Sequence, residues 1–119
     1  MRAIPPIAEL PQFEGDAICQ IWLDPWAVRF LFESGTQVYA EYGIEHHDPD
    51  GTVWRYACQA DGGPPLALHR LLYKRVVAVD HDELRLTFKT EDGAALVILS
   101  DVSPYEAGQI RAGDTTVVF

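Results

Sequence analysis

The chain has 119 residues, of which 48% are hydrophobic and 23% are charged, and its formal net charge at pH 7 is −9. A chain of this length and hydrophobicity is expected to fold as one domain around one core. Its apolar runs are far shorter than the roughly 20 residues that cross a bilayer. The acidic balance disfavours nucleic acid and anionic membrane surfaces as partners.

The sequence carries none of the common markers of secretion or cofactor chemistry. Prolines interrupt the N-terminal residues 1–6, so no secretory signal is expected and the protein is predicted to be cytoplasmic. Cys19 and Cys58 are too few for a disulfide framework, and we expect two buried thiols, with a bridge between them as the alternative. No GxSxG, P-loop, HExxH or dinucleotide-binding glycine pattern occurs, so no cofactor is expected and an enzyme is disfavoured.

An internal repeat is the most informative feature of the chain. After a proline-rich segment, residues 1–12, which we expect to be extended, the pattern of residues 17–42 recurs in residues 75–100 of a single domain, 13–119. In that comparison 18–21 matches 76–79, 28–32 matches 84–88, and 35–38 matches 93–96, a register of 58 residues with a slip of two in the middle. Apolar residues alternate with polar ones, so each copy is predicted to form strand, loop, strand, turn, strand.

The segment between the copies predicts a hairpin and a helix. Asp48-Pro49-Asp50-Gly51 has the composition of a type I turn, so residues 44–58 are expected to form a hairpin. Leucines recur near helical spacing after Pro65, which predicts one short helix over residues 65–73. The fold class is therefore expected to be α+β, mainly antiparallel β.

Two further elements are expected after the second copy. Ser103 and Pro104 have the composition of a helical N-terminus, and the β-branched residues 115–119 predict a last strand. The apolar run 96–99 should be covered on both faces, by the helix, by the N-terminal segment or by another subunit, which leaves a homodimer open.

The duplicated arrangement resembles a family of small bacterial domains of unknown function. The resemblance rests on Val76-x-x-Val79, Leu84-x-Leu86-x-Phe88, Asp92-Gly93, Leu96-x-Ile98 and a closing Tyr105-Glu106-x-x-x-Ile110, and it would cover residues 15–111. Gly108 departs from the pattern, where a bulkier residue is expected. The resemblance implies no activity, although some similar small acidic proteins are thought to be immunity proteins against bacterial toxins.

The first half of the chain is both aromatic and acidic, which favours a protein-binding surface. Residues 1–60 contain nine acidic and three basic residues, and they hold all three tryptophans. Tryptophan and tyrosine are common at binding hot spots, and an acidic surface accelerates the capture of basic partners. We therefore expect a non-catalytic module, of the immunity-inhibitor type, that binds a basic protein. The residues expected to bind it are Trp26, Glu41, Glu45, Asp48, Asp50 and Trp54.

Two alternatives stay open. His46, His47 and Asp50 form the densest group of metal-ligating side chains and would suit a metal-binding protein or a metal-dependent enzyme. Neighbouring residues of a strand point to opposite faces, however, and Asp48 and Asp50 are already explained as turn residues. The other alternative is a structural, homo-oligomeric domain that associates through residues 96–99.

Overall fold

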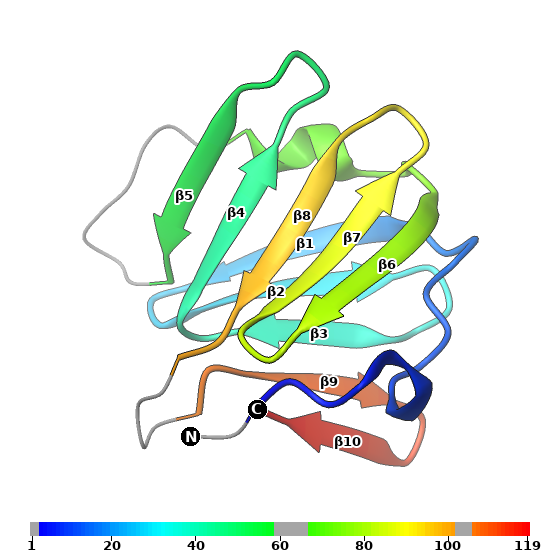
Figure 1. Cartoon of the computed structure of the whole chain (residues 1–119), viewed down its shortest axis with the longest axis vertical. Helices are drawn as coiled ribbons and strands as arrows, with labels where there is room; N and C mark the ends of the chain where they lie inside the picture. Colours follow the sequence, from blue (N-terminus) through cyan, green and yellow to red (C-terminus); the bar gives the residue numbers. More distant parts are fainter. Residues whose placement is uncertain (1–2, 59–66, 102–105) are drawn as a thin grey trace.

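The structure, a computed structural model that describes residues 3–58, 67–101 and 106–119, is built from two five-stranded antiparallel sheets (Figure 1). The first sheet has the strand order β1-β2-β3-β9-β10, and the second has the order β5-β4-β8-β7-β6. The strands are β1 (Ile18–Asp24), β2 (Ala27–Phe32), β3 (Gln37–Ala40), β4 (Gly43–His47), β5 (Val53–Ala57), β6 (Val76–Asp82), β7 (Arg85–Thr90), β8 (Ala95–Leu99), β9 (Gly108–Ala112) and β10 (Thr115–Val118). In Figure 1 the strands of one sheet run across those of the other.

The two halves of the chain exchange hairpins. Strands β1–β3 and β6–β8 each form a three-stranded meander, as the repeat predicts. The β4–β5 hairpin, however, joins the meander of the second copy through β4 and β8, while the β9–β10 hairpin joins that of the first copy through β3 and β9. Each sheet therefore contains strands from both halves of the chain.

The repeat is more regular than the sequence comparison suggests. Phe30 lies opposite Ile21, and Phe88 lies opposite Val79, so the two copies correspond at a uniform offset of 58 residues. The predicted slip of two residues is wrong, because Leu84 belongs to the β6–β7 turn rather than to the strand. Its counterpart in the first copy is Trp26.

A pseudo-twofold axis passes between the two copies at an isolated bridge from Ala17 to Arg75, which are equivalent positions. The hydrogen bonds beside it are reciprocal: Gly15 N donates to Val76 O, and Tyr73 N donates to Ile18 O, both at 2.8 Å. Gly15 has a φ of +84°, and its counterpart Tyr73 has a φ of +61°, a conformation that is rare for residues with a side chain. Tyr73 of the second copy therefore adopts the left-handed backbone conformation that glycine adopts readily at position 15 of the first.

One hydrophobic core fills the space between the sheets. Phe32 and its neighbour Phe88 have ring centroids 5.7 Å apart, and Phe13 packs against both at 5.2 and 4.7 Å. The side chains that alternate inward on β2, β7 and β8 complete the core, as their periodicity predicts. Both cysteines lie in the described residues and are free thiols, but only Cys58 is buried as expected, since Cys19 on β1 is partly exposed. Burial raises the pKa of Cys58 to about 11.

The helical content is smaller than expected, so the fold is mainly antiparallel β rather than α+β. Of the predicted helix 65–73, residues 65 and 66 lie outside the described residues, and the rest contains only the 3-10 helix η2, Leu68–Leu71. One turn is enough to bury Leu68 and Leu71 before the chain reverses at Tyr73. The predicted turn at Ser103 and Pro104 also lies outside the described residues. No helix in the described ranges is long and apolar enough to cross a membrane.

The N-terminal segment packs against the second copy and contains one 3-10 turn. Residues 7–9 form a 3-10 helix, η1 (Ile7–Glu9), that contacts β6, just as η2 contacts β1. The side chain of Ile4 is only 2% exposed and belongs to the core. The segment is the counterpart of the one that contains η2, because each packs against the first strand of the other copy, β6 or β1.

The end of the chain closes the first sheet as predicted, with β10 as its last strand. Phe119 is fully buried, and its main chain exchanges hydrogen bonds with Gly108, each at 3.1 Å. A Cβ atom at position 108 would lie 2.4 Å from Tyr39 O and 2.6 Å from the Phe119 ring. The bulkier residue that the family resemblance leads one to expect there has no room.

Gly15 and Tyr73 are equivalent positions with the same left-handed backbone, so substitutions there test backbone strain. Adding a side chain at one should destabilise the protein, and removing it at the other should stabilise the protein. Gly15→Ala should lower the free energy of unfolding by about 1 kcal/mol, because alanine must adopt a left-handed conformation. Nothing lies within 4 Å of a Cβ atom at Gly15, so strain is the main cost. Tyr73→Gly should raise the free energy of unfolding by about 0.5–1 kcal/mol, since the exposed tyrosine makes few contacts. Urea unfolding measures both, and equal losses in both variants would contradict the equivalence.

Candidate functional site

The structure divides the six residues expected to bind a partner between the two sheets. Trp26 lies in the β1–β2 turn of the first sheet and is 72% exposed. Glu41 follows β3 in the same sheet and is half-buried. The remaining four residues lie on the β4–β5 hairpin of the second sheet: Glu45, Asp48, Asp50 and Trp54. The β1–β2 turn and the β4–β5 turn lie at different edges of the molecule (Figure 1).

Glu45 is the centre of an ion cluster on the outer face of the second sheet. The residue is 4% exposed. Its carboxylate accepts hydrogen bonds from Arg85 at 2.8 Å, from His47 at 3.0 Å and from Arg55 at 3.0 Å. Burial alone would raise the pKa of Glu45, but the hydrogen bonds from these three side chains and the charge of Arg85 lower it to about 2. Its charge is therefore used within the protein rather than offered to a partner.

The same cluster lies beside the apolar run 96–99, for which the sequence predicts a cover by the helix, by the N-terminal segment or by another subunit. Val97 of β8 is buried within the single chain, where it lies directly opposite Glu45 on β4 and Thr87 on β7. Leu96, Val97 and Ile98 are thus buried within the single chain, whereas Leu99 is only partly buried.

His46 is the one histidine in the core. Its ring is fully buried, neither nitrogen has a hydrogen-bond partner in the part of the chain that the structure describes, and Nε2 lies 3.5 Å from Asp48 Oδ1. Arg70 binds Asp48 at 2.5 Å and also lies over the Trp54 ring, which packs against His46. Burial lowers the pKa of His46; the Asp48 charge opposes that effect and the Arg70 charge adds to it. The pseudo-twofold axis places His46 at the position of Ile110, which is an ordinary core residue.

The three residues of the metal-binding alternative, His46, His47 and Asp50, do not come together at one site. His46 points into the core, His47 lies on the outer face with Glu45, and Asp50 accepts a hydrogen bond from Thr52 N within the turn. Within residues 3–58, 67–101 and 106–119, no group of three or more His, Cys, Asp or Glu side chains is arranged to hold a metal ion.

A ladder of alternating aromatic and arginine side chains crosses the outer face of the first sheet. The Arg29 guanidinium lies 5.6 Å from the Trp22 ring centroid and 4.8 Å from that of Tyr39, and Arg111 lies 4.7 Å from Tyr39 on the same ring. These four residues, which we call the aromatic ladder, come from β1, β2, β3 and β9. Asp24 fixes Arg29 by an ion pair of 2.8 Å, and the Trp22 indole N–H donates to Gln20 at 2.9 Å. The ladder is therefore held in place before any partner arrives.

A carboxyl pair lies at one end of the ladder. Burial, a hydrogen bond with the Glu106 side chain and the Glu106 charge raise the pKa of Glu41 to about 7, although the nearby Arg111 lowers it in part. Gln109 donates a hydrogen bond to Glu106 at 3.0 Å. Glu41 therefore changes its charge near neutral pH, at the edge of a surface that is otherwise rigid.

The sequence pattern identifies only part of this surface. Trp22, Arg29 and Tyr39 belong to adjacent strands of the first copy, but nothing local to them indicates which strand follows β3. That neighbour is β9, which brings Arg111 from 72 residues away.

No protein-family model, curated protein or solved structure matches the chain. The resemblance to small bacterial domains of unknown function stays a prediction.

The ion cluster predicts a specific pH dependence of stability. Glu45→Gln should lower the free energy of unfolding at pH 7 by about 2 kcal/mol, less than for a fully buried pair because its arginine partners are partly exposed. Since the folded pKa lies near 2 and the unfolded one near 4.5, this stabilisation is present above pH 4.5 and is lost towards pH 2. Urea unfolding between these limits should show the two proteins converging. As a matched pair, Arg85→Met should cost more than Arg55→Met, and the reverse order would contradict the geometry.

Exchanging the residue types of His46 and its counterpart Ile110 should change the pH dependence of stability in opposite directions. A histidine kept neutral by burial stabilises the fold less as pH falls below its unfolded pKa of 6.5, because the unfolded chain then binds the proton more readily. His46→Ile should therefore be at least as stable as the natural protein at pH 5, and its stability should vary less between pH 7 and 5. The reciprocal variant, Ile110→His, should lose stability and gain that pH dependence. Thermal unfolding at both pH values measures this, and a large loss in His46→Ile at pH 7 would contradict it.

Proposed function

We propose that the protein is a non-catalytic protein-binding module of the immunity-inhibitor type, and that it binds a basic partner through the aromatic ladder and the β1–β2 turn. The observation that supports this most directly is the exposure of two tryptophans: Trp22 of the ladder is 49% exposed, and Trp26 in the adjoining turn is 72% exposed. These two tryptophans lie four residues apart, where β1 ends and turns into β2.

The residue types of the ladder are those that supply most of the binding energy in protein interfaces. Trp, Tyr and Arg are enriched at hot spots because they bury a large area and lose little side-chain freedom when they are already ordered. Arg29 is ordered by Asp24 and by two aromatic rings, and Tyr39 donates a hydrogen bond to Gln37 at 2.6 Å. A partner that covers this surface would therefore pay little additional entropy.

The pairing of the polar groups favours binding over catalysis. The guanidinium groups are engaged by neighbouring side chains, Arg29 by Asp24 and Arg111 by Gln109 at 3.1 Å. A guanidinium stays protonated at neutral pH and is neither a nucleophile nor a base, so these ordered groups serve as anchors and orienting contacts.

The charge of the chain supports a basic partner. A net charge of −9 produces a long-range field that attracts cationic proteins and raises the rate of encounter. Glu41 and Glu106 provide carboxyl groups beside Arg111 at one end of the ladder, so a partner could place its own basic side chains there. The electrostatic field thus acts on the rate of association, while the side chains of the aromatic ladder act on the lifetime of the complex.

The test is affinity capture from a lysate of the organism that carries the gene, followed by binding measurements with the purified partner. Trp26→Ala and Arg29→Ala should each weaken the complex by about 10-fold or more, as expected for hot-spot residues. The natural protein should also lose association rate as NaCl rises from about 0.05 M to about 0.5 M, because screening shortens the reach of its charge. For the inhibitor reading, a stoichiometric amount of the protein should abolish the activity of the captured partner.

Tyr73→Ala is the matched control, because Tyr73 is an exposed aromatic residue outside the first sheet. It should bind the partner as the natural protein does. Equal binding by the Trp26 and Arg29 variants would assign the interaction to another surface, and a salt-independent association rate would contradict the electrostatic part of the proposal.

A further inference from the structure

The outer face of the second sheet carries a hollow at the end where β4 runs into its turn. The hollow, which we call the turn pocket, has a volume of about 470 Å³. Its floor is a row of side chains that crosses four neighbouring strands: His47 of β4, Ala95 of β8, Lys89 of β7 and Val77 of β6. Val77 lies at the register shift of β6 and is 56% exposed. The small residue Ala95 therefore lies between two long side chains, His47 and Lys89.

Two turns form the walls of the turn pocket. The lining residues that they contribute are Asp48, Pro49 and Gly51 of the β4–β5 turn and Thr90, Gly93 and Ala94 of the β7–β8 turn. Each turn is closed by its own hydrogen bonds: Asp48 N donates to Thr52 O at 2.8 Å, and Thr90 N donates to Ala94 O at 3.0 Å. The turns also approach each other, because a Cβ atom at Gly93 would lie 3.8 Å from Pro49 Cβ. The pocket is therefore formed before any ligand arrives.

The pseudo-twofold axis shows which residues open this pocket. In the first sheet the equivalent row of residues is Arg111, Gln37, Leu31 and Cys19. Gln37 thus takes the place of Ala95, and its side chain accepts a hydrogen bond from Tyr39 at 2.6 Å. The hollow beside Gln37 and Leu31 holds only about 10 Å³. Residues 48–52 separate β4 from β5, whereas residues 113 and 114 separate β9 from β10. A smaller residue and a longer turn therefore distinguish the second sheet.

Lys89 supplies the charge that a ligand in the turn pocket can reach. Its ammonium group pairs with Asp80 at 2.7 Å, but the two side chains are 55% and 60% exposed, and such surface pairs contribute little. Asp48 also lines the pocket, but it is 9% exposed and is paired with Arg70 at 2.5 Å. Asp92 accepts hydrogen bonds from within its own turn. Among the described residues of the lining, the charge available to a ligand is therefore positive.

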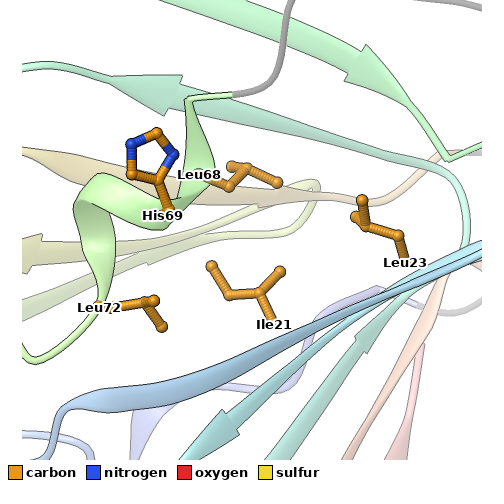
Figure 2. Close-up of a pocket in the computed structure, with 5 residues that line it drawn as sticks. All are labelled: Ile21, Leu23, Leu68, His69 and Leu72. Atoms are coloured by element: carbon orange, nitrogen blue, oxygen red, sulfur yellow. The ribbon is translucent and has the colours of Figure 1, made fainter.

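The rest of the lining suits an apolar group. Pro49, Val77, Ala94 and Ala95 present aliphatic carbon atoms, and a volume of about 470 Å³ lies within the range of small-molecule sites, roughly 300–1,000 Å³. The pocket between β1 and η2, shown in Figure 2, has a volume of about 240 Å³, and its described lining combines four aliphatic side chains with His69. Apolar walls with a few placed polar groups are the usual composition of a small-ligand site, and the turn pocket adds the charge of a lysine to them.

We propose that the turn pocket binds a small carboxylate that has a compact apolar body. The carboxylate would pair with the Lys89 ammonium group, and the body would lie on Ala95 between Val77 and Pro49. A cationic ligand is disfavoured because Lys89 would repel it. This site is separate from the proposed protein-binding surface, because the turn pocket belongs to the second sheet and the aromatic ladder to the first.

The probe is benzoate, and its binding is followed by amide NMR of the full chain. Saturable shifts are expected at Gly51, Gly93 and Ala95, with a Kd in the millimolar range that a ligand of this size supports. Benzamide has nearly the same shape without the charge, so it should bind about 3-fold more weakly or worse, because it loses the charge-assisted hydrogen bond to Lys89. Benzylamine, which is a cation at pH 7, should bind no better than benzamide.

Two variants test the residues that define the pocket. Ala95→Gln should abolish the saturable shifts, because it introduces the side chain that the first sheet has at the equivalent position. Since the first sheet accommodates Gln37 there, thermal unfolding should show this variant folded. Lys89→Met should weaken benzoate binding by about 3-fold or more and leave benzamide binding unchanged. Lys74→Met is the matched control, because it removes the same charge from the chain's other lysine, outside the lining, and it should bind benzoate as the natural protein does.

Several outcomes would overturn the proposal. One is the absence of saturable shifts with benzoate, and another is binding of benzamide or benzylamine that equals that of benzoate. Shifts that persist in Ala95→Gln, or that centre on Leu23 and Leu68, would place benzoate outside the turn pocket. Equal weakening by Lys89→Met and Lys74→Met would reduce the effect to net charge and remove Lys89 from the site.

Discussion

The exchange of hairpins between the two copies is the constraint on which the rest of the structure depends. Neither copy can complete a sheet alone, because the neighbour of β3 is β9 and the neighbour of β8 is β4. Buried residues of β1 to β9 form one core, against which Val117 of β10 packs, and in it Phe32 of the first copy contacts Phe88 of the second. Folding must therefore bring residues from the two ends of the chain together, and the whole domain is expected to unfold as one cooperative unit.

A symmetric frame makes the differences between the copies informative. At equivalent core positions one copy has His46 and the other Ile110, although the fold requires only an apolar residue there. On the outer faces, Glu45 of the second sheet corresponds to Gln109 of the first. The second sheet has used its charges for internal pairing, whereas the first keeps its aromatic side chains at the surface. Departures from local rules are expected where function or strain requires them, and here they separate the two sheets.

The sequence predicts local elements well because period-two alternation and turn residues depend on near neighbours. The hairpin 44–58, the two meanders and the last strand are confirmed. The predicted slip of two residues was wrong for a physical reason. A shift by two along a strand keeps every side chain on its own face. The hydrophobic pattern therefore cannot tell whether Leu84 or Leu86 is the counterpart of Val28 in the second copy. The position of the hairpins was not predictable, since pairing across more than 50 residues leaves no local trace.

The candidate site was less accessible to prediction than the fold. The acidic residues of the first half suggested a surface, but Glu45 is neutralised by Arg85, which lies 40 residues away. Trp26 and Trp22 were recognisable because they replace charged or aliphatic residues of the other copy. Arg111 was not, because only the β3–β9 pairing brings it to Tyr39. Composition thus indicates what kinds of contact a face can make, while the non-local pairing decides which of those side chains remain available.

The asymmetry at the two outermost strands follows from the same frame. Because each copy presents β1 or β6 at the free side of its sheet, each needs a segment to cover the apolar residues beside that strand. The N-terminal segment does this for β6 with Ile4, which joins the core. Beside β1 the described residues leave Leu23 largely exposed, next to Trp22 and Trp26. An exposed apolar group of this kind is costly in a free protein, and its cost is offset when a partner covers it. Among the described residues, the two copies therefore differ in how far their outermost strands are covered.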